Sequence, residues 1–372
     1  MAISNEEQQR YWFLFGLINF LLGFAVQSSI IFIPLLGAQL GASDFQVGLV
    51  GTVYGAAFLL SSLISGWKSD SLGRLLFVRW GLLLSSLAFA LQLLAQNVIL
   101  LMVFRSMVGL ALGIATAAII AYAFESGIDM GKFSSYGSLG WIFSALAAAL
   151  VKNIDTLFLF SFLSSLIAFF FSLAFRKAPE PELPEQPNPW QVARRNHRVY
   201  LAVFLRHLGA TAVWIIMPLY LVELGLDEFW IGIMWGINFT VQAVVMRCLE
   251  RFPEHKTFAI GQLMSILVFI LFAYARGRFS LVAAQALLGV AWSCLYVGAL
   301  LIIMRSGEAR GTASGIFQST LNLCNAIGPF LGGVIAQGWG YRGVMFFAAA
   351  LGVAGMLAAA PKSQAPVSSN SK

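Results

Sequence analysis

The chain alternates between long apolar runs and short polar connections. A helix needs about 20 mainly apolar residues to cross a bilayer, and the sequence contains twelve such runs. We predict membrane-spanning helices over residues 11–38, 46–65, 75–95, 98–124, 134–151, 156–175, 199–222, 230–249, 257–275, 279–304, 312–337 and 342–360. The one long polar connection, 176–198, is rich in proline and charge and is typical of an extended linker. The sequence therefore predicts six helices in residues 1–175 and six in 199–361, followed by a tail at 362–372.

The composition excludes an ordinary soluble domain. The 372 residues are 59% hydrophobic and only 10% charged, whereas about 25% of the residues of a soluble domain are charged. So little charge cannot cover a water-facing surface, and in lipid a helix satisfies its own backbone hydrogen bonds. We therefore expect an all-α membrane protein. The net charge of +7 does not indicate nucleic-acid binding, because the basic residues are spread over the ends of the apolar runs.

The positions of the lysines and arginines predict the orientation in the membrane. With the N-terminus in the cytoplasm, most of the 23 basic residues fall on the cytoplasmic side. This asymmetry follows the positive-inside rule, so we expect an inner-membrane protein with both termini and the linker in the cytoplasm. The exceptions are Lys152, Arg276, Arg278 and Arg342 on the outer side, and Arg105 and Arg206 within predicted helices.

The two groups of helices carry a repeated segment. IFIPLLGAQLGASDFQVGLV at 31–50 aligns without a gap with IIMPLYLVELGLDEFWIGIM at 215–234. The matched pairs are Pro34 with Pro218, Gly41 with Gly225, Asp44 with Glu228, Phe45 with Phe229 and Gly48 with Gly232. Matches at one constant offset, at the same place in each group, predict two pseudo-symmetric bundles with a path between them.

The connection between the second and third predicted helices, GWKSDSLGRL, is unusually polar. Gly66 and Gly73 permit a tight turn, because glycine tolerates positive φ. We expect Asp70 to face a helix N-terminus and Arg74 to face a carboxylate, with Glu125 delivered to the same surface by the fourth helix. These residues would form a latch that holds the cytoplasmic side shut and breaks when that side opens. The alternative is a solvated cluster that only anchors the loop in the cytoplasm.

This loop resembles a signature of the major facilitator superfamily, whose positions are matched by Gly66, Asp70, Gly73 and Arg74. The fourth helix is similar to a second signature, Arg-x-x-x-Gly-x-x-x-Gly, through Arg105, Gly109 and Gly113. The resemblance implies the major facilitator fold, with 12 transmembrane helices in two six-helix bundles. It also implies transport by alternating access, along a path lined by helices 1, 4, 7 and 10.

The match to the family is incomplete. Ser71 and Leu75 stand where the loop signature carries basic residues. Many proton-driven drug exporters of the family have a Gly-Pro turn in the fifth helix, whereas this chain has Gly137 and Gly140 there without proline. These departures weaken the prediction of drug–proton antiport.

Three ionisable side chains fall within the predicted pathway helices. Arg105 is predicted either to contact an anionic group of the substrate or to clamp neighbouring helices through hydrogen bonds. Arg206 is expected to extend to the cytoplasmic surface. His207 lies seven residues before Trp214 and shares its helix face. It is a candidate carrier of a coupling proton, with a structural histidine as the alternative.

Amide and aromatic side chains recur at helical spacing along the same helices. They can coordinate a ligand or hydrogen-bond one helix to another. The candidate pathway residues are Gln27, Trp214, Asn238, Gln242, Trp292, Tyr296, Gln318 and Asn322. No acidic residue lies in the middle of a predicted helix. Proton coupling would therefore need His207, Glu125 or a carboxylate at a helix end.

These features predict a secondary transporter, with export of a small amphipathic or aromatic compound favoured and protons as candidate coupling ions. Import or uniport of a small organic anion or other metabolite is the alternative, because Arg105 and Arg206 have no acidic partner within the membrane. A membrane sensor is the alternative of another class. We expect no enzymatic activity, metal or cofactor, since the three histidines and three cysteines have no ligand spacing. The expected partners are a small-molecule substrate and the lipid bilayer, with the protein monomeric and not bound to nucleic acid.

Overall fold

The computed structural model describes residues 5–128, 130–175, 189–249, 251–306 and 310–359, and the regular structure in these ranges is helical. The first half contains α1 (Asn5–Ile30), α2 (Ile33–Gln39), α3 (Asp44–Leu72), α4 (Arg74–Leu91), η1 (Gln92–Leu94), α5 (Val98–Glu125), α6 (Met130–Val151) and α7 (Ile154–Ser172). The second half contains α8 (Pro189–Arg195), α9 (His197–Glu223), α10 (Glu228–Leu249), α11 (Glu254–Tyr274), α12 (Arg278–Arg305) and α13 (Arg310–Ala359). Eleven helical stretches in the described ranges are long and apolar enough to cross a membrane, and the last of them contains two predicted spans.

Pro34 decides where the first predicted span breaks. The sequence predicts one helix over 11–38, but α1 ends at Ile30 and α2 begins at Ile33. Pro34 has no backbone N–H to donate to the carbonyl of Ile30, and proline is well suited to the first turn of a new helix.

Gly340 separates the last two predicted spans. The ranges 312–337 and 342–360 form the two arms of α13, which bends at Gly340 with φ 71° and ψ 175°. The helix therefore turns back across the membrane at a single glycine, and the predicted boundary is confirmed.

Part of the linker is helical. The prediction of an extended chain over 176–198 is wrong for Pro189–Arg195, which forms α8. The Arg195 guanidinium donates to the carbonyl of Ser306 at 2.7 Å, and the Asn196 amide donates to the Ser306 hydroxyl. These bonds fasten the start of the second half to the end of α12.

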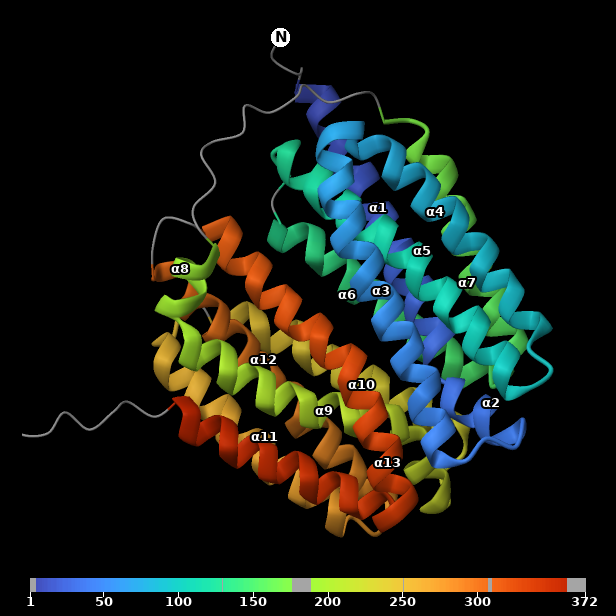
Figure 1. Cartoon of the computed structure of the whole chain (residues 1–372), viewed down its shortest axis with the longest axis vertical. Helices are drawn as coiled ribbons and strands as arrows, with labels where there is room; N and C mark the ends of the chain where they lie inside the picture. Colours follow the sequence, from blue (N-terminus) through green and yellow to red (C-terminus); the bar gives the residue numbers. More distant parts are fainter. Residues whose placement is uncertain (1–4, 129, 176–188, 250, 307–309, 360–372) are drawn as a thin grey trace, which may run out of the picture.

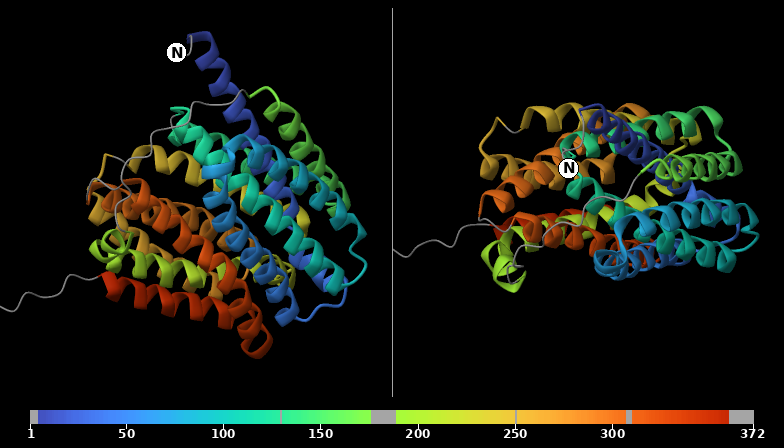
Figure 2. Two further views of the ribbon diagram at one scale, coloured as in Figure 1. Left: turned by 45° about the horizontal axis from the view of Figure 1, so that its top comes forward. Right: turned by 90° about the horizontal axis from the view of Figure 1, so that it is seen from above.

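The helices form two groups that follow the chain order (Figure 1). In the first group α1 packs on α6 and α7, and α5 packs on α3 and α4. In the second group α9 packs on α13, and α12 packs on α10 and α11. The groups meet where α3 packs on α13 and where α6 packs on α10. The ribbons approach each other near α2 and diverge toward α8 (Figure 1, Figure 2), and we call these the α2 end and the α8 end.

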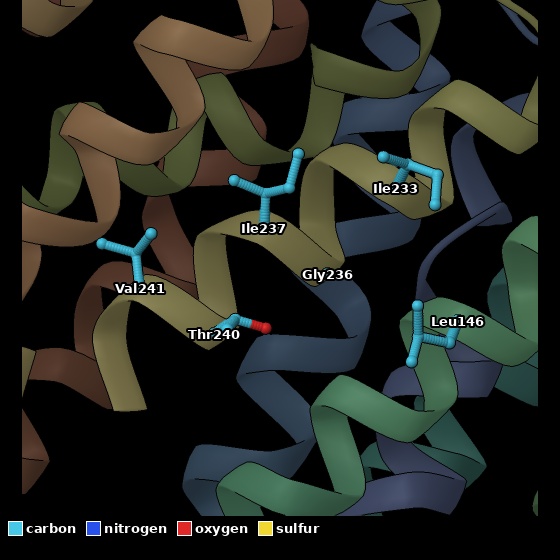
Figure 3. A pocket seen from close by; sticks show the side chains of 6 residues that line it. All are labelled: Leu146, Ile233, Gly236, Ile237, Thr240 and Val241. Atoms are coloured by element: carbon cyan, nitrogen blue, oxygen red, sulfur yellow. The ribbon is translucent and has the colours of Figure 1, made fainter. Parts of the chain in front are cut away.

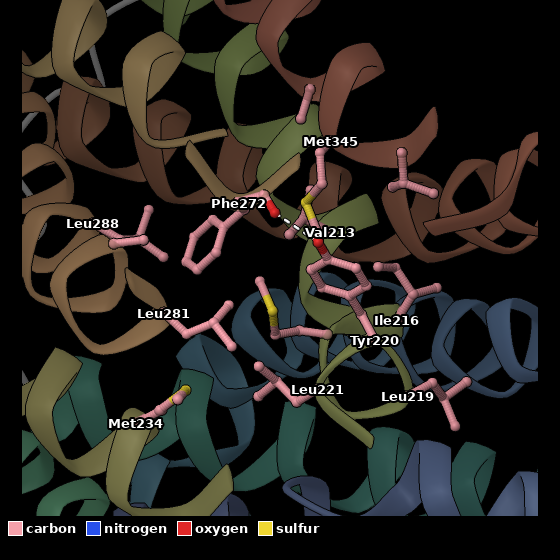
Figure 4. Close-up of a cluster of buried hydrophobic side chains, with 14 of the residues drawn as sticks. Val213, Ile216, Leu219, Tyr220, Leu221, Met234, Phe272, Leu281, Leu288 and Met345 are labelled. Atoms are coloured by element: carbon pink, nitrogen blue, oxygen red, sulfur yellow. Dashed lines mark hydrogen bonds between the residues drawn. The ribbon is translucent and has the colours of Figure 1, made fainter. Parts of the chain in front are cut away.

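Apolar side chains fill each group and also join the two groups at the α2 end. One buried cluster combines Phe32 and Val47 of the first half with Val213 and Tyr220 of the second. Figure 4 shows part of this cluster, including the hydroxyl of Tyr220, which donates to the carbonyl of Phe272 at 2.7 Å. In a bilayer such packing stabilises through van der Waals contact rather than through removal of surface from water.

The predicted repeat is visible in the backbone. Gly41 and Gly225, a matched pair, have φ of 83° and 80°, a conformation that glycine adopts far more readily than other residues. Gly48 and Gly232, another matched pair, both lie at contacts between the halves. A Cβ would lie 2.5 Å from the α13 backbone at Gly48 and 2.6 Å from the α6 backbone at Gly232. The repeat thus places equivalent turns and equivalent close contacts in each half.

Candidate substrate site

The first contact between the halves joins α3 to α13. The Tyr341 hydroxyl donates to Asp44 Oδ1 at 3.0 Å, and the Phe45 backbone N–H donates to Gln337 Oε1 at 3.5 Å. Farther along α3, the backbone of α13 approaches Gly55 so closely that a side chain there would clash. The two helices are therefore in contact from the α2 end to near the middle of the spans.

The second contact joins α6 to α10. Lys152 Nζ lies 2.8 Å from Asp227 Oδ2 at the α2 end. The hydrogen bond from Lys152 lowers the pKa of Asp227 below its usual 3.8. Toward the middle of the spans the ring centres of Trp141 and Phe239 lie 5.6 Å apart. We call the α3–α13 and α6–α10 contacts together the seam.

An aromatic stack of α9 and α12 lies near the middle of the second half; it consists of His207, Trp214, Trp292 and Tyr296. His207 stacks on Trp292 with ring centres 4.9 Å apart and meets Trp214 edge-on at 5.2 Å. The Tyr296 ring is 5.4 Å from Trp292. His207 is buried, whereas the other three are partly exposed. The predicted shared face of His207 and Trp214 is confirmed, and the partly exposed rings can bind an aromatic group by stacking.

Arg206 lies beside this stack, and the expectation that it reaches the surface is wrong. The residue is 0% exposed. Its Nε donates to Ser265 Oγ at 2.8 Å, and its guanidinium carbon lies 5.3 Å from the Trp292 ring and 5.5 Å from the Phe269 ring. Nη1 and Nη2 are buried and have no hydrogen-bond partner among the described residues.

Arg105 is the corresponding buried arginine of the first half, and it has partners. Its Nη1 donates to Ser29 Oγ at 2.8 Å and to Gln92 Oε1 at 3.1 Å. Its guanidinium carbon lies 4.3 Å from the Tyr54 ring. Gln27, two residues before Ser29, is half-buried. Arg105 thus links α1, α3, η1 and α5, which favours the clamp among its two predicted roles.

The predicted amides form pairs along the helices. Asn238 donates to the carbonyl of Gln285 at 3.0 Å and accepts from Gln242 at 2.6 Å, which joins α10 to α12. On α13, Gln318 donates to Asn322 at 3.5 Å. The first pair serves helix packing, while Gln318 is exposed and Asn322 is half-buried, so both remain open to a ligand.

Most of the polar segment GWKSDSLGRL is helical, because α3 extends to Leu72, and only Gly73 forms the turn into α4. The expectation that Gly66 also takes part in the turn is wrong, since Gly66 lies within α3. Gly73 ends α3 with φ 96°. Arg74 Nη1 donates to the carbonyl of Gly66 at 3.2 Å and so fastens the turn to the end of α3. The side chains of Asp70 and Glu125 lie outside the described part of the structure, and the latch stays a prediction.

A small apolar pocket lies between α6 and α10 (Figure 3). It has a volume of about 250 Å³ and is lined by Leu146, Ile233, Gly236, Ile237, Thr240 and Val241. None of these is a predicted pathway residue, and only Thr240 brings a polar side chain. Over the described ranges, no three His, Cys, Asp or Glu side chains are grouped as a metal ion would require. The aromatic stack is therefore the candidate substrate site.

The sequence profile of the Major Facilitator Superfamily matches residues 15–249 and 199–372. The chain belongs to the Major Facilitator Superfamily. The resemblance inferred from the loop and fourth-helix signatures is confirmed, and the protein is a multi-pass membrane transporter of that superfamily.

Relatives within the superfamily differ in what their names describe. Multidrug resistance protein MdtG of Salmonella dublin and of Salmonella typhimurium are each 26% identical over 356 residues, covering 87% of this chain and 88% of the relative. The nucleoside transporter NupG has a TM-score of 0.75 at 17% identity, covering 93% of this chain and 97% of that one. The human organic anion transporter MFSD10 has a TM-score of 0.71 at 17% identity, covering 95% and 99%. A bacterial homologue of the human lysosomal transporter Spinster, in an inward-facing and occupied conformation, has a TM-score of 0.79 at 13% identity and covers 96% of each chain.

Two polar residues of this Major Facilitator protein escaped the sequence-based prediction. Gln262 and Ser265 are buried in α11, and Ser265 accepts the hydrogen bond from Arg206. Their spacing of three residues puts both on one helix face, and polar residues so placed in an apolar span mark a contact with another helix or a ligand. The three-residue spacing could have identified Gln262 and Ser265 from the sequence, but it does not predict that Arg206 is the partner of Ser265.

Proposed function

We propose that this transporter exports small amphipathic or aromatic compounds by alternating access between its two halves. The observation that carries the proposal is the partly exposed aromatic stack of Trp214, Trp292 and Tyr296. It lies close to the seam, since a side chain at Gly51 would meet both Pro329 of α13 and Ile215, the neighbour of Trp214. Indole and phenol rings there offer flat apolar faces with polar edges, which suits an amphipathic ligand.

The seam supports alternating access. Its contacts hold the halves together from the α2 end to the middle of the spans, and those involving Tyr341–Asp44 and Lys152–Asp227 are hydrogen bonds that can break. In the orientation predicted by the positive-inside rule the α8 end is cytoplasmic, so this arrangement is the inward-facing state of an inner-membrane protein. A rocking motion of the two halves would break the seam and bring the α8 ends together.

Export receives further support from the relatives named multidrug resistance protein, which match most of this chain.

Protons are the proposed coupling ions, with His207 in the aromatic stack as their carrier. A sensor, in contrast, would bind the same compounds without moving them across the membrane.

Import of a small organic anion is the second candidate, and Arg206 is the observation that favours it. Its two terminal nitrogens are buried without partners among the described residues. A positive charge in that state attracts an anionic group.

Flux into proteoliposomes tests the proposal. We expect the purified protein to move fluorescent aromatic compounds when a proton gradient is imposed. Trp292→Ala should weaken the apparent affinity by about tenfold, because it removes the ring shared by His207 and Tyr296. Trp80→Ala is the matched control, since Trp80 is 55% exposed on α4 and should leave flux unchanged. Equal losses in both variants, or saturable binding without flux, would contradict export through this stack.

A further inference from the structure

Arg206 carries a buried positive charge that no described residue neutralises. It is 0% exposed, and it forms neither an ion pair nor a hydrogen bond through Nη1 or Nη2 within the described ranges. Burying a charge is costly unless a counter-ion or several hydrogen bonds accompany it. Arginine keeps its proton in proteins, so the cost is not relieved by loss of the charge. None of the described residues supplies the partner that this charge requires.

The surroundings hold the guanidinium in one orientation. The Nε–H of Arg206 donates a hydrogen bond to the Ser265 hydroxyl. That hydroxyl in turn donates to the carbonyl of Gly261 at 2.7 Å, which fixes its position. The rings of Trp292 and Phe269 lie 5.3 and 5.5 Å from the guanidinium carbon. The two terminal nitrogens are left as a rigid pair of donors, the geometry with which arginine binds anions.

A second buried polar group, Gln262, lies one helical turn from Ser265 on α11. Gln262 precedes Ser265 by three residues on α11, so the two side chains share a face. Gln262 is 1% exposed, and among the described residues neither its Oε1 nor its Nε2 has a hydrogen-bond partner. A buried carboxamide without partners is unusual in folded proteins, and its N–H₂ is a further donor for an anion held by Arg206.

We propose that Arg206 and Gln262 bind a small monovalent anion between α9, α11 and α12. The chemistry is that of a singly charged acceptor, supplied by a free inorganic anion such as chloride or nitrate, or by the carboxylate of a transported molecule. Trp292 belongs to the aromatic stack and lies beside Arg206, so an aromatic carboxylate would place its ring at the stack and its charge at Arg206. Only this second source depends on the proposed transport function.

Anion binding can be measured on the full chain in detergent without any flux assay. Sodium chloride, nitrate or benzoate is titrated against sodium gluconate at constant ionic strength, with the thermal unfolding midpoint and tryptophan fluorescence as readouts. We expect saturable stabilisation and a fluorescence change from Trp292. Arg206→Gln should raise the half-saturation concentration by about tenfold or more, because a charge-assisted pair is lost. Arg278→Gln is the matched control, since Arg278 lies 5.3 Å from the Trp230 ring but is exposed, and it should bind as the wild type does.

Two measurements keep the test valid if Arg206→Gln does not fold. Gln262→Leu keeps the charge of Arg206 and should weaken anion binding by a smaller factor than Arg206→Gln does. Wild-type crystals soaked in bromide should give an anomalous peak beside the Arg206 guanidinium. No saturable response of the wild type to any of the three anions, or no bromide at this position, would overturn the proposal.

Competition between chloride and benzoate identifies the source of the anion. A resident inorganic anion is indicated if chloride binds but benzoate neither competes with it nor is transported. The carboxylate of a substrate is indicated if benzoate displaces chloride and its flux disappears in Arg206→Gln. Chloride binding that persists in a protein that moves no aromatic compound would contradict the proposed export and leave the anion site intact.

Discussion

Lys152 Nζ lies 2.8 Å from Asp227 Oδ2, and this ion pair joins the residue after α6 to the loop before α10. Lys152 has φ 54°, in the left-handed region that residues other than glycine enter at some cost. Both side chains remain about half exposed, at 44% and 50%. A pair so exposed adds little to the stability of the fold. We infer that its role is to bias the halves toward the closed α2 end.

Removal of the pair should therefore change conformation more than stability. In Lys152→Asn the charge is lost while asparagine tolerates the positive φ. We expect the free energy of unfolding to change by less than about 1 kcal/mol, while the α2 end opens more often. Spin labels at Gln39→Cys and Gly338→Cys, in a background without the native cysteines, measure the opening as a longer distance. The exchanged double variant Lys152→Asp with Asp227→Lys should restore the short distance, and a distance unchanged in Lys152→Asn would remove this role.

The same pair should not respond to pH near neutrality. Lys152 lowers the pKa of Asp227 below 3.8, so the contribution of the pair is present above that usual value and is lost only as pH falls through the lowered pKa. We expect the spin-label distance to be constant between about pH 8 and pH 5. A change in that interval that survives in Asp227→Asn would assign the pH response to another group.

The seam should not tolerate a side chain at the glycines of α3 that pack against α13, such as Gly48. A Cβ at Gly48 would lie 2.5 Å from the carbonyl oxygen of Pro329, so Gly48→Ala must push the helices apart at a cost of about 1–3 kcal/mol to the closed state. We expect slower flux and longer spin-label distances at the α2 end. Gly315→Ala is the control, because nothing lies within 4 Å of its added Cβ. If both variants behave like the wild type, α3 and α13 do not pack this closely in the working protein.

Proton coupling through His207 has a direct test. His207 is 3% exposed and is held between Trp214 and Trp292, so protonation there would disturb the stack. His207→Gln keeps a polar side chain of similar length but does not titrate. We expect flux driven by a pH gradient to disappear while downhill exchange of substrate continues. Gradient-driven flux that persists in this variant would exclude His207 as the carrier.

The cytoplasmic latch predicts a different phenotype. Asp70→Asn should slow transport without impairing membrane insertion or folding, because the loss concerns a contact made only when the α8 end is closed. Flux and thermal unfolding of the same preparation measure the two effects. An unchanged transport rate would remove the latch.

The spans, the turn at Gly73 and the repeat followed from sequence, and each has a local cause. A helix in lipid satisfies its own backbone hydrogen bonds, so a long apolar run is sufficient to predict it. Gly41 and Gly225 could be matched by their offset alone, and both have positive φ. The α1–α2 break and α8 were missed, since in an apolar run Pro34 is compatible with either a kink or a break.

Sequence by itself thus determined which segments cross the membrane and that the two halves are related, because both depend on neighbours along the chain. Only the tertiary structure decided how Arg105 and Arg206 differ. Each is an arginine in an apolar helix, but Arg105 meets Ser29 and Gln92, brought from α1 and η1, whereas the terminal nitrogens of Arg206 meet none of the described polar groups. Whether a buried charge has hydrogen-bond partners depends on side chains far away in sequence, and the periodicity of the sequence does not predict which of them will contact it.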